Sequence, residues 1–196
     1  ISTCWSFSRK GSRHRRCEVG ALSDQPISFQ HYDPSGTCWT QGKKFEYVCR
    51  AAFEREGYKT RESTKEEDIK LHADFWVYSE VWGRWVTVDA KARKRIQRNG
   101  PIQDEFTYIE WKNTTGRAGC LLCGADIMAF ERQHDIVLIT RAALLNVATE
   151  LVDRTKKVRL PSDSLYASYS RQGRDDEISM IRLTDIPRDT VKIWTK

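Results

Sequence analysis

The sequence predicts an α/β fold in which a mixed central β-sheet of about five strands is flanked by helices. Three features indicate this fold: an amphipathic helical pattern that begins at residue 43, two alternating runs of β-branched and aromatic residues after it, and further strand-like and helix-like segments downstream. The chain has 196 residues, which suits one domain of ~100–200 residues. We expect an irregular basic N-terminal arm over 1–42, a core over 43–152 and a C-terminal extension over 153–196 packed on that core.

The composition excludes two classes of protein. Hydrophobic residues make up 39% and charged residues 31%, which is too apolar for a disordered chain and too polar for a membrane protein. No apolar run approaches the ~18 residues of a transmembrane helix. The 33 Lys and Arg exceed the 27 Asp and Glu, so the net charge of +6 favours an anionic partner, with nucleic acid as the first candidate.

The N-terminal 42 residues are rich in Ser, Gly, Arg and Cys and show no helical or strand periodicity. Five basic residues and no acid precede Glu18. Two interpretations stay open: a poorly ordered extension, and a basic arm that binds nucleic acid. Because residue 1 is Ile rather than Met, we also expect a fragment or a processed product, with an upstream domain left open.

The first regular element is a helix that begins at Lys43. Its apolar residues recur at i, i+3, i+4, i+7 and i+8 from Phe45, and Gly57 ends it. A short extended stretch follows over Tyr58 to Arg61, and a charged loop over Ser63 to Lys70.

Residues 72–93 predict a β-hairpin about a Trp82-Gly83 turn. A two-residue turn would place Asp74 opposite Lys91 and Trp76 opposite Asp89, with all four side chains on one face. The opposite face would pack on the preceding helix. A slip of one residue would separate the set.

The rest of the chain predicts shorter elements. A turn at residues 99–101, a Gly-punctuated loop at 114–119 and the breakers Pro161 and Pro187 separate them. The expected strands are 106–112, 125–131, 135–141, 178–183 and 190–194, and the expected helix is 142–152.

The predicted hairpin brings together two carboxylates and an ammonium group. Because neighbouring carboxylates repel, a hard divalent cation with oxygen ligands is the natural compensation, and Mg²⁺ fits best. Such an ion polarises a phosphoryl oxygen and lowers the pKa of bound water, while a lysine orients that water or balances charge, as in a phosphodiesterase. The alternative is a surface hairpin whose Asp and Lys form solvated pairs worth little.

The order of these residues resembles the PD-(D/E)XK nuclease superfamily, which includes restriction endonucleases and archaeal Holliday-junction resolvases. The residues that carry the resemblance are Glu46 on the helix, His72-Ala73-Asp74, and Val88-Asp89-Ala90-Lys91. The residue before Asp74 is Ala rather than Pro, which departs from the family's pattern. Residues 110–131 are similar to uncharacterised phage-type members, so the resemblance extends loosely to about residue 150.

The resemblance implies a restriction-endonuclease-like fold and metal-dependent hydrolysis of DNA. Asp74 and Asp89, with the Ala90 carbonyl, would hold Mg²⁺ or Mn²⁺, Glu46 would act on the metal through water, and Lys91 would assist the attacking water. A homodimer and a phage origin are compatible with it. A catalytically inactive nucleic-acid-binding module of the same fold is the alternative function, and a zinc-stabilised interaction protein is a third class.

Basic residues near this site are the candidates for DNA contact. They are Lys43, Lys44, Arg93, Lys94, Arg95, Arg98, Lys112 and Arg117. Glu110-x-Lys112 is itself an acid-x-Lys strand, so a rival interpretation makes that pair the motif, with Asp89 as the lone Asp. In the main interpretation Glu110 supports the site or faces DNA, and Lys112 contacts phosphate.

The six cysteines, at 4, 17, 38, 49, 120 and 123, do not suggest a disulfide framework. Cys49 falls on the apolar side of the predicted helix, and no signal segment opens the sequence, so we expect reduced thiols and a cytoplasmic protein. Cys120-x₂-Cys123 has the spacing of a zinc knuckle, but there is no second pair to complete four ligands. We favour buried thiols there and keep zinc as the alternative.

Overall fold

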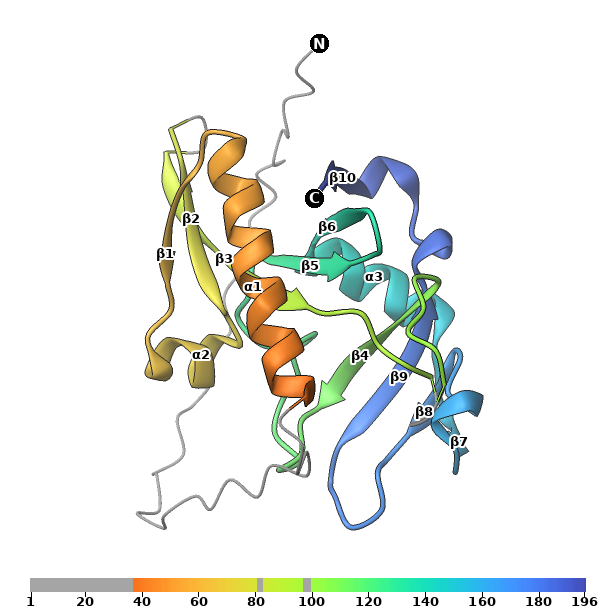
Figure 1. Ribbon diagram of the computed structural model, residues 1–196. Helices are drawn as coiled ribbons and strands as arrows, with labels where there is room; N and C mark the ends of the chain where they lie inside the picture. Colours follow the sequence, from red (N-terminus) through yellow and green to blue (C-terminus); the bar gives the residue numbers. More distant parts are fainter. Residues whose placement is uncertain (1–36, 81–82, 97–99) are drawn as a thin grey trace. The chain divides into compact units, whose positions relative to one another are not determined.

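The computed structural model describes residues 37–80, 83–96 and 100–196 (Figure 1). They belong to one structural unit, Asp33–Lys196. The first 36 residues of the expected N-terminal arm lie outside the described residues. No helix in the described part of the chain is long and apolar enough to span a membrane.

The predicted α/β class is confirmed, but the prediction of one sheet with about five strands is wrong. The described residues form two sheets, of six and four strands. The larger sheet has the order β1 (Lys59–Glu62), β2 (Phe75–Ser79), β3 (Arg84–Lys91), β5 (Ile127–Glu131), β6 (Asp135–Thr140), β10 (Val191–Thr195). The smaller sheet has the order β4 (Phe106–Lys112), β9 (Glu177–Arg182), β8 (Ala167–Tyr169), β7 (Asp153–Val158). The sequence pattern marks strands but not their partners, and β4 pairs with β9 rather than with the central strands.

The larger sheet is mixed, as predicted. β3 and β5 run parallel, with Val88 opposite Ile127 and Lys91 opposite Phe130, while the other neighbours in this sheet are antiparallel. Parallel neighbours need a long crossover, and here the crossover over residues 92–126 carries β4 into the second sheet. The crossover therefore places β4 on one face of the larger sheet.

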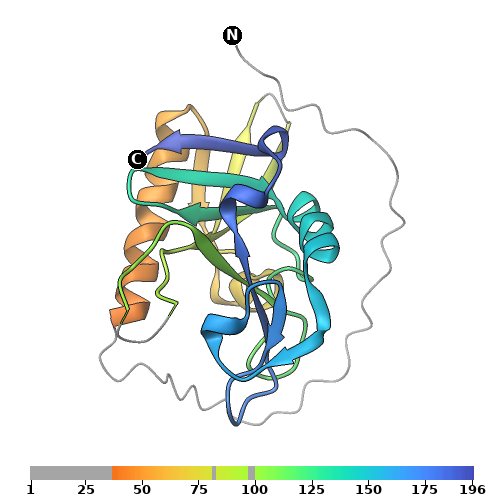
Figure 2. The ribbon, with the colours of Figure 1, turned by 90° about the vertical axis from the view of Figure 1, so that its right-hand side faces the viewer.

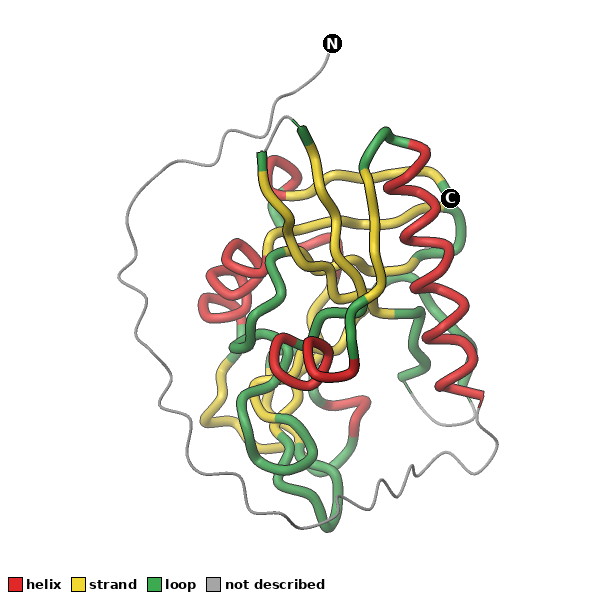
Figure 3. Tube along the Cα trace, turned by 90° about the vertical axis from the view of Figure 1, so that its left-hand side faces the viewer, coloured by secondary structure: helices red, strands yellow, loops and turns green. Residues whose placement is uncertain are grey.

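Helix α1 (Thr37–Arg55) covers the other face of the larger sheet and starts six residues before the predicted Lys43. Seen from the side of β1, it runs along the strands (Figure 3). Its buried residues Phe45, Cys49 and Phe53 belong to one core cluster with the inward residues of β2 and β3. Gly57, with φ +87°, follows the helix in the left-handed conformation that favours glycine, as the sequence predicted.

The predicted charged loop over residues 63–70 is instead a short helix, α2 (Lys65–Leu71). A capping box begins it: Glu67 N donates to Thr64 Oγ1 at 3.2 Å, and Thr64 N donates to Glu67 Oε2 at 2.8 Å. The Thr-x-x-Glu pattern was readable in the sequence. It was missed because α2 has no buried face and therefore no apolar periodicity.

The second sheet and helix α3 (Arg141–Leu151) cover the face opposite α1 (Figure 2). Met128 and Phe130 of β5 share a core cluster with Trp111 of β4 and Leu144 of α3. This arrangement agrees with the expectation that helices flank both faces. It also means that charged side chains of β3 on this face lie next to a covering layer.

The hairpin of β2 and β3 has a register two residues away from the predicted one. Trp76 lies opposite Thr87 rather than opposite Asp89, because residues 80–83 connect the strands in place of a two-residue turn. An even shift keeps every side chain on its predicted face. Asp89 and Lys91 therefore remain on the face opposite α1.

The remaining elements match the sequence closely, with two exceptions. The predicted strands 106–112, 125–131, 135–141, 178–183 and 190–194 and the helix 142–152 correspond to β4, β5, β6, β9, β10 and α3 within about two residues. The strands β7 and β8 were not predicted. β7 is exposed and polar at five of its six positions, and β8 has three residues, so neither carries a readable alternation.

The Phe53 ring is the centre of the aromatic packing between α1 and the larger sheet. Its centroid lies 4.6 Å from that of Trp194 and 5.8 Å from that of Phe75, both in edge-on geometry. We predict that Phe53→Ala lowers the free energy of unfolding by about 3–5 kcal/mol in urea titrations. Tyr47→Ala, on the same helix but 67% exposed, changes it by less than about 0.5 kcal/mol. Equal losses in the two variants would contradict this packing.

Candidate functional site

Asp74 lies just before β2 and is fixed to β3 by two hydrogen bonds. Its backbone N donates to Val88 O at 2.8 Å, and its Oδ2 accepts from Ala90 N at 2.7 Å. These two bonds lie on either side of Asp89 in the sequence of β3. The start of β2 therefore presents the Asp74 carboxylate next to the position of Asp89.

Asp89 is a buried charge in the centre of the larger sheet. Its side chain is 3% exposed, and its Oδ1 lies 2.7 Å from Lys91 Nζ. Its Oδ2 is fully buried and has no hydrogen-bond partner among the described residues. A buried, unpaired carboxylate oxygen costs free energy, so it needs a partner or a functional explanation.

Lys91 is the partly exposed partner of this buried carboxylate. Its side chain is 27% exposed and its Nζ forms the ion pair with Asp89. Burial alone favours the neutral amine, but the carboxylates of Asp89 and Asp74 outweigh it and raise the pKa of Lys91 well above its ordinary value. Lys91 is therefore a fixed positive charge beside two carboxylates.

Burial, and after it the neighbouring Asp89 carboxylate, together raise the pKa of Asp74 to about 8. Lys91 and the Ala90 N–H act in the opposite direction but are too weak to restore the ordinary value. Two carboxylates that disfavour joint ionisation in this way attract a cation. The repulsion predicted from the sequence is present in the structure.

Glu46 reaches this site from the first half of α1. Its side chain is 19% exposed and pairs with Lys43 at 2.6 Å, and its charge acts on Asp74. The charge of Glu110 in β4 also raises the pKa of Lys91. The structure thus places Asp74 next to Asp89 and Lys91, while Glu46 on α1 and Glu110 on β4 act on this group through their charges.

Among the described residues, no group of three or more His, Cys, Asp or Glu side chains is positioned to hold a metal ion. The donor set still fits a hard cation, because Asp74 and Asp89 supply oxygen ligands and the buried Oδ2 of Asp89 has no other partner. Glu46 would be the third oxygen ligand, through water.

The basic residues predicted to contact DNA fall into three places. Lys43 and Lys44 lie on α1, Arg93, Lys94 and Arg95 follow β3, and Lys112 and Arg117 lie at the end of β4 and in the turn after it. Arg98 lies outside the described residues. Of these, Arg93 forms an ion pair with Asp104 at 2.6 Å, so it is less available for a DNA phosphate than its position in the sequence indicated.

Cys120 and Cys123 do not form a paired site. Burial raises the pKa of the Cys120 thiol to about 12, so it stays protonated in the core. The Sγ of Cys123 donates to Ala118 O at 3.2 Å, and this side chain is only partly buried. The favoured interpretation of buried thiols therefore agrees with Cys120 but not with Cys123.

A second charged cluster, which was not predicted from the sequence, lies in the smaller sheet. Asp176 and Glu177 are buried and paired with Arg171, Arg154 and Lys157. The acidic run at 175–177 was visible in the sequence, but Arg154 and Lys157 are about twenty residues away on an unpredicted strand. The cluster could not be assembled without the strand pairing.

No protein-family model, no curated protein and no solved structure matches this chain. The assignment of a function therefore depends on the geometry of the site alone.

In metal-free buffer, we predict that Asp74 makes stability fall with rising pH. Its folded pKa of about 8 lies above an unfolded value of about 3.9, so between these values the folded state binds the extra proton and loses stability as pH rises. Asp74→Asn removes this contribution, at most about 1.4 kcal/mol for each pH unit, and leaves the acceptor for Ala90 N in place.

The measurement is urea unfolding in EDTA at several pH values from 5 to 8. Asp189→Asn, an exposed acid at the far edge of the same sheet, serves as the control and should keep the wild-type slope. If Asp74→Asn and the wild type have the same slope, Asp74 is ionised throughout and the site is not as desolvated as the structure indicates.

Proposed function

We propose that the chain is a metal-dependent nuclease that hydrolyses DNA phosphodiester bonds, with a core similar to restriction endonucleases. The observation that supports this most is the unpaired, buried Oδ2 of Asp89 beside the perturbed carboxylate of Asp74 and the ammonium of Lys91. A purely structural ion pair does not need a second carboxylate directed at it, because that carboxylate adds repulsion. A cation-binding site does need it.

The order of elements around the site supports the finer proposal on fold. A helix with an acid is followed by the antiparallel strands β1, β2 and β3, and then by a crossover to the parallel strand β5. Asp74 lies at the start of β2 and Asp89-x-Lys91 at the end of β3, which is the placement that the superfamily motif requires. The crossover carries a strand of a second sheet, and this is where the chain departs from a simple core.

In the proposed reaction each residue has one task. Asp74 and Asp89 hold the cation with Glu46 acting through water, and Lys91 orients the attacking water and offsets the charge that grows on the phosphoryl oxygens. Bound Mg²⁺ or Mn²⁺ would supply Lewis acidity at the phosphate and a lower pKa for the attacking water. Asp89, with smaller contributions that include the charge of Glu110, keeps the Lys91 ammonium protonated.

A nucleic-acid-binding module without catalysis is the second candidate function. The observation that favours it is the direct Asp89–Lys91 ion pair, which balances the charge of Asp89 without a metal. In that case the pair is structural and the basic residues alone serve the function.

Cleavage of supercoiled plasmid and of labelled single-stranded DNA, with Mg²⁺, Mn²⁺ or EDTA, separates these candidates. We predict metal-dependent cleavage that falls at least about 100-fold in Asp89→Asn, which keeps the shape of the side chain but removes the anionic ligand, and in Lys91→Arg, which keeps the ion pair but changes the water-orienting group. Asp189→Asn keeps wild-type activity. Thermal unfolding of each variant shows whether the fold is intact.

If the folded wild type binds DNA without cleaving it, and Asp89→Asn and Lys91→Arg bind DNA equally well, the nuclease proposal is rejected. The binding module would then remain as the function.

A further inference from the structure

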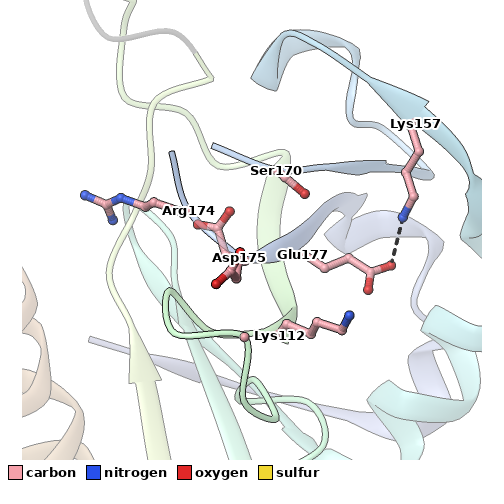
Figure 4. A pocket seen from close by; sticks show the side chains of 8 residues that line it. Lys112, Lys157, Ser170, Arg174, Asp175 and Glu177 are labelled. Carbon is pink, nitrogen blue, oxygen red and sulfur yellow. Dashed lines mark hydrogen bonds and ion pairs between the residues drawn. The ribbon is translucent and has the colours of Figure 1, made fainter. Parts of the chain in front are cut away.

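A polar pocket of about 420 Å³ lies in the smaller sheet, away from the Asp74–Asp89–Lys91 site (Figure 4). Lys112 and Gly116 line it from the end of β4 and the following turn, Lys157 from β7, and residues 174–177 from the segment that leads into β9. The close view shows the Lys157 ammonium beside the Glu177 carboxylate (Figure 4). Its lining is almost entirely charged or polar, so an apolar ligand does not fit it.

The two buried acids of this pocket are already neutralised by arginines that do not line it. Arg154 binds Glu177 through two hydrogen bonds of 2.9 and 2.7 Å. Arg171 donates to Asp176 from its backbone N at 2.8 Å and from its Nε. Arg154 holds the pKa of Glu177 at about 2, so this carboxylate stays ionised and does not release its partner. These acids therefore do not repel an anion as free carboxylates would.

The remaining cations of the pocket have unused donors. Lys157 Nζ donates to Ser168 Oγ at 2.9 Å and weakly to Glu177 Oε1 at 3.4 Å, which leaves a third hydrogen. In the described part of the chain, Lys112 and Arg174 form no ion pair with an acid. The lining itself contains three cations and the three acids at 175–177, and the Arg174 guanidinium points away from the two lysines (Figure 4). The two arginines that hold the buried acids from outside the lining add two positive charges, so the surroundings of the pocket carry a net excess of two.

The turn that carries Gly116 holds the two walls of the pocket together. Asn113 Oδ1 accepts from Thr115 N at 3.0 Å and from Arg117 N at 3.1 Å, which fixes the turn directly after Lys112. Gly116 has φ +76°, and a Cβ there would lie 3.2 Å from Asp175 Cβ. The backbone of this turn thus lies close to the opposite wall, where a side chain at position 116 would crowd Asp175, so the turn directly after Lys112 has little freedom to move.

We propose that this pocket binds phosphate groups of the nucleic-acid strand whose cleavage is proposed above. Lysine and arginine donors with an excess of positive charge recognise phosphate, and the polar lining suits a hydrated anion. The inference rests on the proposed function for its location. The charge of Glu110 acts on Lys91 at the candidate active site. Lys112 lies two residues further along β4, about 7 Å from Glu110, so β4 contributes a residue to each of the two sites.

The test measures binding, so it does not depend on cleavage. Fluorescence anisotropy of labelled single-stranded and duplex oligonucleotides is recorded in EDTA with the full chain at several salt concentrations. We expect Lys112→Gln to weaken binding about tenfold at low salt and to reduce the slope of log K against log[salt] by about one, because one phosphate contact is lost. We expect Lys157→Gln to weaken binding and reduce the salt slope in the same way.

Lys156→Gln is the matched control. Lys156 is the lysine next to Lys157 on β7, but it does not line the pocket. It should leave the affinity and the salt slope close to the wild-type values. Thermal unfolding of the three variants establishes that Lys112→Gln and Lys157→Gln remain folded.

Two further comparisons identify the source of the phosphate. A loss that is equal for 5′-phosphate and 5′-hydroxyl oligonucleotides and disappears with an uncharged methylphosphonate backbone assigns backbone phosphates. A loss confined to the 5′-phosphate oligonucleotide assigns a terminal phosphate. Either result supports a phosphate site.

Salt slopes of Lys112→Gln and Lys157→Gln that match Lys156→Gln, or a wild type that binds no oligonucleotide, would overturn the inference. Failure of the two proposals is distinguishable. If the protein cleaves DNA but Lys112→Gln does not change DNA binding, only the phosphate-pocket proposal is rejected. If Lys112→Gln reduces the salt slope but the wild type shows no metal-dependent cleavage, only the nuclease proposal is rejected.

Discussion

The Asp89–Lys91 ion pair is the constraint on which the arrangement of the candidate site depends. It lies on the face of β3 that the second sheet covers, so its charges cannot be solvated fully and must be satisfied locally. Lys91 satisfies one oxygen of Asp89, and the other remains without a partner in the described residues. Asp74, fixed by Val88 and Ala90, then adds a second carboxylate to a site that already contains an unsatisfied one. A bound cation would neutralise the two carboxylates and give Asp89 Oδ2 a partner, which would account for this combination.

The secondary structure of the first half of the core was largely readable because its elements have strong periodicity. The apolar stripe of α1 and the alternation of β2 and β3 each have one buried face. The hairpin register was missed because the turn was assumed to have two residues, whereas four connect the strands. β7 and α2 were missed because neither element buries a face that the pattern could reveal.

The site was predicted in composition but not in full geometry. Asp74, Asp89 and Lys91 fall on one face because alternation along a strand is a local property that survives an even shift of register. The approach of Glu110 from a second sheet depends on long-range strand pairing, which a single sequence does not encode in a readable way. The same holds for the pocket, whose charges come from β4, β7 and the segment before β9.

The central claim is that Asp74 and Asp89 form a cation site, and Mn²⁺ binding tests it most directly. Titration of the metal-free protein with Mn²⁺, followed by electron paramagnetic resonance of the free ion, should show saturable binding to the wild type. We expect that binding to be lost in Asp89→Asn and in Asp74→Asn and kept in Asp189→Asn. Equal Mn²⁺ binding by the wild type and both site variants, or no saturable binding by the folded wild type, would contradict the account.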